Sequence, residues 1–556
     1  MADTKASTGV DAKDLDALKA AVPSMVWIQI ENSSSNVTVK YKTNDSEADV
    51  VSIQVAPESS DGVKSLLDCV EALLLQNPPL LREFLLETPP GFTEDYSSAM
   101  APFYPMCKKI GSATSLQLAT IPGCIGSLQG LTANIDNPQT SLQRIRITKT
   151  TGYEGFICVD SRQQVWEVLL SAIAKSQLKE LMLDLESFDE MTDGDNPTLL
   201  CKDLCATIQQ CKTLEIFHIK AGPFWIGDAE ESWWDDEELQ HSLSNHPALT
   251  DFGIWTGNDD APVGAAIGKA MAVNSKLRKL ACRGMGGMDS LKPLFEGGLS
   301  QNTTLESLEL DMSNYEGAAP IVNGLQSMAS IAASTRDADG ELCRPLHLKH
   351  LGVYRDKKEP PVVPINRRQK KKKNKKNKNK NKAEPEPEPK PEPKPEPKLD
   401  QNVEFNKILE CLVRNKIAIE TLSFGIDGGD SDWDDACTVD RLPFISEDTA
   451  IPLELPNLIR GCKSLKSILI LGMTDRPDTD FSDICQTAKE ISSLVSIEIA
   501  GFALHKTFNN EADPNRHMLQ RLLRDRATPR SSRYGPIPSS VCRIVASSAN
   551  TQKRDR

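Results

Sequence analysis

One short pattern recurs along the middle of this 556-residue chain: an apolar residue, two others, a second apolar residue, one other and a third apolar residue. The last two apolar positions alternate with another residue, as a short strand with one buried face requires. The pattern therefore predicts ten strands, within the segments Leu142–Ile147, Leu178–Leu183, Leu214–Ile219, Leu249–Ile254, Leu277–Cys282, Leu305–Leu310, Leu348–Val353, Ile419–Phe424, Leu465–Ile470 and Leu494–Ile499.

Stretches with helical periodicity separate these strands. Those with a clear apolar face run over residues 163–177, 198–211, 263–274, 290–302, 404–415 and 480–491. A single strand–helix unit cannot cover its own apolar surfaces, so such units must stack side by side. Successive copies begin 28 to 46 residues apart, except for one interval of 71. The chain is therefore predicted to be an α/β solenoid.

The pattern resembles the leucine-rich repeat family, in its longer ribonuclease-inhibitor-like class, from about residue 142 to residue 499. Several copies carry the Asn or Cys that often precedes the strand in that family, namely Cys211, Asn274, Asn302 and Cys462. The family's buried Asn beyond the strand is replaced, for example by Glu186, so the repeats are degenerate. The resemblance implies parallel strands on a concave face with helices outside.

The N-terminal part follows a different pattern. Alternating apolar residues at Val26–Ile30 and Val37–Tyr41 flank a turn-rich NSSSN segment, which predicts a hairpin. Val51–Val55 has the same alternation and is expected to be a third strand, followed by a helix over residues 62–75. This small α+β element fits equally well as a cap of the array or as a separate module. No pattern assigns residues 77–137.

A low-complexity insertion interrupts the repeats. Eleven of the sixteen residues from Arg367 to Lys382 are basic, and a Pro-Glu/Lys repeat follows them. Such a segment cannot bury apolar surface and is expected to be disordered. The predicted organisation is a disordered N-terminus (1–23), the α+β element (24–137), a first repeat block (138–365), the disordered insertion (366–399), a second repeat block with a cap (400–526) and a C-terminal tail (527–556).

The Lys-rich run has three interpretations. Its charge density is that of a nuclear localisation signal. It could equally bind nucleic acid or an anionic membrane through counterion release. The third interpretation is a solvated insertion without a partner. The residues concerned are Arg367, Arg368, Lys370, Lys371, Lys372, Lys373, Lys375 and Lys376.

Acidic loops with tryptophans follow several of the predicted strands. Because the carboxyl ends of parallel strands meet at one edge of a sheet, these loops are expected to gather there and to bind a basic protein. The alternative is that they are solvated loops of a chain with net charge −14. The candidate protein-binding residues are Trp225, Trp233, Trp234, Asp235, Asp236, Glu237, Glu238, Trp255, Asp430, Asp432, Trp433 and Asp434.

No arrangement of residues indicates catalysis or a metal site. A calcium loop starting at Asp430 would need Gly and Glu where Asp435 and Arg441 stand. Cys201, Cys205 and Cys211 could form a zinc set with His218. Cys201 and Cys205 lie one helical turn apart on an apolar stripe, however, which favours core packing over zinc binding. We therefore expect no cofactor and no enzyme activity.

These patterns favour a protein–protein interaction scaffold. An adaptor tethered to nucleic acid or an anionic membrane through the Lys-rich insertion is the alternative, and an enzyme is a distant third. The polar N-terminus lacks the order of a signal peptide, and no stretch has the length of a membrane span. The fourteen cysteines are then expected to be reduced, in a cytoplasmic or nuclear protein.

Deleting residues 366–399 and joining the ends with a short Gly-Ser bridge should leave the melting temperature within a few degrees. The closure entropy of a loop grows only slowly with its length, so shortening this loop changes stability little. Differential scanning calorimetry of the parent and the deletion variant tests this. A large drop in the melting temperature would show that the segment packs against the folded part.

Overall fold

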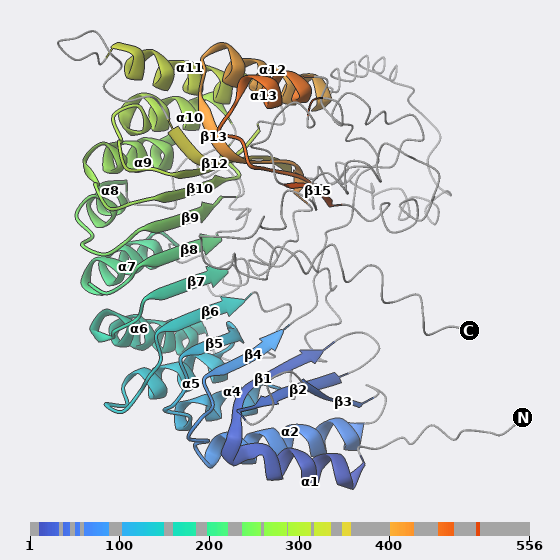
Figure 1. Ribbon diagram of the computed structural model, residues 1–556. Helices are drawn as coiled ribbons and strands as arrows, with labels where there is room; N and C mark the ends of the chain where they lie inside the picture. The colour runs from blue at the N-terminus through green and yellow to red at the C-terminus, as the bar shows by residue number, and fades with distance from the viewer. Residues whose placement is uncertain are drawn as a thin grey trace, which may run out of the picture.

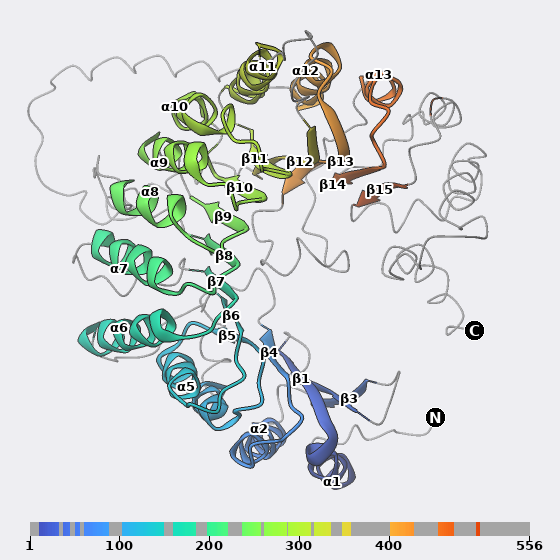
Figure 2. The same ribbon diagram turned by 60° about the vertical axis from the view of Figure 1, so that its left-hand side comes forward.

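A computed structural model describes residues 11–32, 37–44, 50–55, 60–87, 103–148, 159–184, 197–220, 236–256, 261–285, 287–312, 316–334, 347–356, 401–427, 454–471, 487 and 496–500. The strands in these ranges form one fifteen-stranded sheet in the order β15-β14-β13-β12-β11-β10-β9-β8-β7-β6-β5-β4-β1-β2-β3. The sheet curves, with the strands lining its inner side and the helices its outer side (Figures 1 and 2). This is the α/β, solenoid-like architecture that the repeats predict.

The predicted N-terminal hairpin is confirmed. The first elements are α1 (Ala12–Ala21), β1 (Met25–Asn32), β2 (Val37–Thr43), β3 (Val51–Val55) and α2 (Ser60–Leu75). Strand β2 pairs antiparallel with β1 on one side and with β3 on the other. Strand β1 also pairs in parallel with β4 (Glu83–Glu87), so the α+β element is continuous with the array.

Strands and helices alternate from β4 to β14. From β4 to β15, each strand pairs in parallel with the next one in the sequence. The elements are α4 (Tyr104–Cys107), β5 (Leu118–Pro122), α5 (Ile125–Ile135), β6 (Arg144–Thr148), α6 (Val159–Lys175), β7 (Glu180–Asp184), α7 (Pro197–Gln210), β8 (Ile216–Lys220), α8 (Asp236–Ser244), β9 (Asp251–Trp255), α9 (Ala261–Val273), β10 (Lys279–Arg283), α10 (Met288–Leu294), β11 (Ser307–Asp311), α11 (Ala319–Ser334), β12 (His347–Asp356), α12 (Gln401–Arg414), β13 (Ala418–Asp427), α13 (Leu455–Gly461), β14 (Ser467–Leu471) and β15 (Ser496–Ala500).

All ten predicted strands are present, and those of their apolar positions whose side chains are described lie in the core. Leu181, Leu183, Leu308, Leu310 and Ile468 are each 0% exposed. The side chain of Ile470, also expected in the core, lies outside the described residues. The helices predicted at 163–177, 198–211, 263–274 and 404–415 correspond to α6, α7, α9 and α12. The helix predicted at 480–491 lies outside the described residues, apart from position 487.

The same apolar pattern extends further towards the N-terminus than the ten predicted copies. It occurs in β1, β4 and β5 as Met25-Ile28-Ile30, Leu81-Phe84-Leu86 and Leu116-Ala119-Ile121, and each of these residues is 0% exposed. Two of these copies fall in the unassigned residues 77–137. The small Ala119 and the many Pro and Gly nearby hide the periodicity in the sequence.

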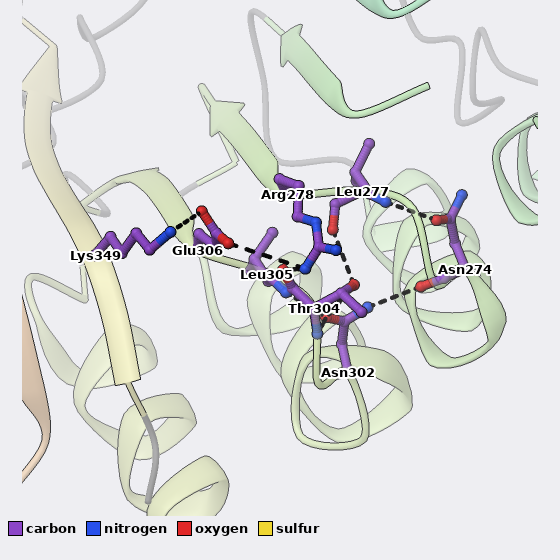
Figure 3. A network of polar contacts seen from close by, with 8 residues as sticks. All are labelled: Asn274, Leu277, Arg278, Asn302, Thr304, Leu305, Glu306 and Lys349. Carbon is purple, nitrogen blue, oxygen red and sulfur yellow. Dashed lines mark hydrogen bonds and ion pairs between the residues drawn. The ribbon is translucent and has the colours of Figure 1, made fainter. Parts of the chain in front are cut away.

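A chain of polar side chains links neighbouring units where each helix turns into the next strand (Figure 3). The amide nitrogen of Asn302 donates to the carbonyl oxygens of Met271 and Asn274, at 2.8 and 3.1 Å. Its amide oxygen accepts the backbone N–H of Leu305 at 2.8 Å. Asn274 repeats the arrangement one unit earlier, donating to Leu243 O at 2.6 Å and accepting from Leu277 N at 2.8 Å.

Other residue types occupy the same position in other units. His246 contacts Cys211 O through Nε2 at 3.1 Å. Cys211 and Cys462 are placed likewise, with Cys462 Sγ 3.4 Å from Ile419 O. Each side chain satisfies backbone groups that would otherwise be buried without partners at a helix end. The Asn and Cys residues before the strands therefore tie each unit to the one before it.

Replacing Asn274 by Ala should lower the free energy of unfolding by on the order of 3 kcal/mol. The substitution leaves a buried carbonyl and two backbone N–H groups without their partner. Urea denaturation followed by tryptophan fluorescence measures the loss. Asn323→Ala, at an exposed position of α11, is the matched control and should change stability by less than about 0.5 kcal/mol. Equal effects of the two variants would contradict a structural role of the Asn274 contacts.

Candidate interaction surface on the inner face of the sheet

The strand pattern decides which side chains reach the inner face. In β8, Phe217 and Ile219 are fully buried in the core, so the alternating residues Ile216, His218 and Lys220 face the other side. Because neighbouring strands pair in register, equivalent positions form rows across the sheet. We call the following residues of β8–β12 the inner-face cluster: His218, Asp251, Trp255, Lys279, Arg283, Glu309, Asp311, His350 and Tyr354.

Arg283 is the centre of this cluster. Its guanidinium lies 4.0 Å from the ring centroid of Tyr354 and 5.8 Å from that of Trp255, as cation–π contacts require. Its Nε donates to Asp311 Oδ1 at 2.5 Å, and both side chains are buried. A second carboxylate, Glu309, approaches Nη1 at 4.0 Å. Arg283 therefore holds aromatic rings and carboxylates from three neighbouring strands.

Asp311 makes a further contact that needs glycine. Its Oδ2 accepts the backbone N–H of Gly284 at 2.6 Å. Gly284 has φ of 76°, and a Cβ there would lie 1.6 Å from the carbonyl oxygen of Thr256. Only glycine fits this conformation and this close approach. The chain leaving β10 is thus fixed by the same carboxylate that neutralises Arg283.

His218 and Trp255 form the second part of the cluster. His218 Nε2 lies 2.9 Å from Asp251 Oδ1, and the opposite oxygen of that carboxylate is 3.3 Å from Lys279 Nζ. The His218 and Trp255 rings are 6.2 Å apart at a tilt of 49°. Both rings lie over Gly253, where a Cβ would come within 2.8 Å of the indole. The missing side chain at Gly253 makes room for the two rings.

A third contact repeats this design. His350 Nε2 lies 3.4 Å from Glu309 Oε1. The Tyr354 ring covers Gly352, where a Cβ would come within 2.8 Å of the ring. The His218–Trp255 part and the His350–Tyr354 part of the cluster therefore each combine an imidazole–carboxylate contact with an aromatic ring over a glycine.

The electrostatics of the two carboxylates follow from these contacts. Burial acts to raise the pKa of Asp251, but the hydrogen bond and charge of His218 and the charge of Lys279 outweigh it, so the pKa is lowered. Burial likewise acts to raise the pKa of Glu309. The hydrogen bond and charge of His350 and the charge of Arg283 outweigh this effect, so the pKa of Glu309 is also lowered. A lowered folded-state pKa stabilises the fold above the unfolded value. That stability is lost as the pH falls below about 4.

Of the predicted site residues, Trp255 alone is part of the inner-face cluster. Asp236 begins α8, and Glu237 and Glu238 follow it in that outer helix, the first exposed and the second partly buried. These two glutamates line an open groove of about 520 Å³ between α8 and α9, beside His241 and Lys269. The structure therefore places Trp255 on the inner layer and the two glutamates on the outer layer.

The remaining predicted site residues lie outside the described residues. They are Trp225, Trp233, Trp234, Asp235, Asp430, Asp432, Trp433 and Asp434, and the basic residues Arg367, Arg368, Lys370, Lys371, Lys372, Lys373, Lys375 and Lys376. The convergence of the acidic loops therefore stays a prediction. The other inner-face residues were missed because the repeat pattern constrains only the apolar positions. Reading the alternate positions, strand by strand, would have found them.

Within the described ranges, no group of three or more His, Cys, Asp or Glu side chains is placed to hold a metal ion. Cys205 and Cys211 are both fully buried in the core, whereas His218 faces the inner side of the sheet. In the same part of the chain, every helix is too short or too polar to cross a lipid bilayer. A scan against protein-family models found no match, and a search of curated proteins found no significantly similar sequence.

Replacing Arg283 by Met should cost about 3–5 kcal/mol of unfolding free energy, because Asp311 would stay buried without its partner. The double variant Arg283→Met/Asp311→Leu should recover only part of this loss, because it also removes the acceptor of the Gly284 N–H. Lys279→Met removes an exposed cation from the neighbouring carboxylate and should cost less than about 1 kcal/mol. Urea denaturation of the three variants gives the comparison. A double variant as unstable as Arg283→Met would show that other contacts decide the cost.

Proposed function

We propose that this chain is a leucine-rich-repeat protein that acts as a non-catalytic scaffold for a basic protein partner. The observation that carries the proposal is the common edge at which the strands end. Asp184, Lys220 and Trp255, the last residues of β7, β8 and β9, lie side by side in register. The acidic and Trp-bearing segments of the sequence start at that edge, whatever their own conformation.

The distances along the edge suit a protein partner. Strand β13, from which the acidic segment around Asp430 starts, is five strands from β8. At about 4.8 Å per strand this is on the order of 25 Å, the width of a standard protein–protein interface. A partner of ordinary size can therefore contact all these segments together.

Charge and aromatic content favour a basic surface on that partner. Residues 222–239 contain seven carboxylates and the three tryptophans Trp225, Trp233 and Trp234. Interfacial tryptophans stabilise the complex and so mainly slow its dissociation, whereas charges at the rim mainly speed association. Trp255 belongs to the same edge, and its position beside Arg283 and His218 extends the binding surface onto the inner face.

The alternative function uses the Lys-rich insertion. Its ends are attached at Asp356, the last residue of β12, and at Gln401, the first residue of α12. Eleven basic residues between Arg367 and Lys382 suit nucleic acid or an anionic membrane. The two functions depend on charges of opposite sign, so variants can separate them.

Quantitative affinity capture with the full chain as bait separates the two functions. An acidic variant carries Asp235→Asn, Asp236→Asn, Glu237→Gln and Glu238→Gln; a basic variant carries Gln in place of the lysines from Lys370 to Lys382. Partners should be lost with the acidic variant and retained with the basic one. The reverse result would favour the adaptor. A control with Asn at the exposed Asp14, Asp16, Asp61 and Asp68 also removes four carboxylates and should bind like the parent.

Kinetics with a captured partner sharpen this test. Replacing Trp233 and Trp234 by Ala should accelerate dissociation at least tenfold, since an interface tryptophan contributes about 2 kcal/mol or more. The acidic variant should instead lower the association rate and flatten its dependence on salt. Surface plasmon resonance at two salt concentrations measures both rates. Unchanged dissociation in the tryptophan variant would exclude these side chains from the interface.

A further inference from the structure

Strand β3 ends the sheet on its N-terminal side. In the described part of the chain it has a strand neighbour only on the β2 side, where Val39 is opposite Ile53. Figure 1 shows β3 as the outermost strand beside β2. Such an edge presents unpaired backbone N–H and C=O groups, to which another strand can add.

The sequence of β3 lacks the usual protection of an edge strand. Natural edges carry Lys, Pro or a β-bulge that prevents further pairing. Val51–Val55 reads VSIQV, with no charge and no proline, and its pairing with β2 is regular over all five residues. The strand is thus both prone to β structure and uncharged.

The apolar face of β3 is incompletely covered. Val51, Ile53 and Val55 lie on the same face, because side chains alternate along a strand. Ile53 and Val55 belong to the core, but Val51 is 44% exposed and the preceding Val50 is 50% exposed. Ser52 and Gln54 point to the opposite face and are exposed. Val51 is thus the exposed end of an otherwise buried row.

We propose that β3 binds β3 of a second copy of this chain, antiparallel and related by a twofold axis at Ile53. In this register Ile53 lies opposite itself, Val51 opposite Val55 of the second copy, and Ser52 opposite its Gln54. The exposed Val51 thereby gains an apolar neighbour on the core face. On the exposed face, opposite the core, a hydroxyl meets an amide, which can hydrogen-bond to it. No like charges meet along the strand, so the segment is complementary to itself.

The size of the contact determines the strength of the dimer. Five residues extend over about 17 Å, so the paired edges bury less than the ~1,200 Å² of a stable interface. The dimer is therefore transient, with a dissociation constant of about 10–100 µM. This interface is distinct from the edge proposed to bind a basic protein, because it lies at the end of the sheet and involves uncharged residues.

Sedimentation velocity of the full chain from about 1 to 200 µM tests the dimer. The variant Ser52→Glu/Gln54→Glu places carboxylates opposite each other in the proposed register and should weaken association about tenfold or more. The variant Ser52→Glu/Gln54→Lys places a carboxylate opposite an ammonium and should restore association. Both variants change exposed side chains, and circular dichroism checks that they fold like the parent.

The comparison between the two variants decides the register. Restored dimerisation with opposite charges, after its loss with like charges, supports pairing through β3 about Ile53. A parent chain that stays monomeric up to about 200 µM overturns the proposal. Equal association of the two charged variants also overturns it, because charges elsewhere than in a paired β3 would not distinguish them.

Discussion

In-register parallel pairing of short strands is the constraint on which the rest of this structure depends. Strands such as β6, β7 and β8 are only five residues long. Such short strands form few backbone hydrogen bonds per pair, so these bonds alone fix the register weakly. A shift by one residue would turn the apolar side chains away from the helices. The apolar residue three positions before the strand core and the polar contacts of Asn274 and Asn302 fix this register at the amino end of each strand.

The same constraint creates the inner-face cluster. Fixing Phe252 and Ile254 in the core also fixes Asp251, Gly253 and Trp255 on the opposite face. Register then brings Arg283 beside Trp255, and Asp311 beside Tyr354. Residues far apart in the sequence therefore meet because their strands are neighbours in the sheet. A buried arginine is tolerated there because a carboxylate and aromatic faces replace its water.

The fold was predictable because its strongest determinant is local. The pattern that places Leu181 and Leu183 in a strand lies within six residues, and the neighbouring helices follow from their own periodicity. Where that pattern weakens, as at Ala119 in β5, the sequence alone left the segment unassigned. The inner-face contacts were not predictable in the same way. The pairing of Arg283 with Asp311 depends on which strands are neighbours and on register, and neither is visible in the residues between the apolar positions.

The distribution of charge explains why the negative charge of the proposed partner surface should come mainly from residues outside the inner-face cluster. Within the cluster, Lys279 and Arg283 contact three carboxylates, and a histidine also approaches two of these, so the charges largely neutralise one another. Without the eleven basic residues of Arg367–Lys382, the rest of the chain would carry a net charge of −25. This excess must come from other residues, and residues 222–239 alone contain seven carboxylates. The basic insertion is attached beside β13, at the same end of the strands as the acidic segment after Asp427. If the proposed basic partner binds at this edge, the positive charge of the insertion opposes its attraction, and removing that charge should strengthen binding.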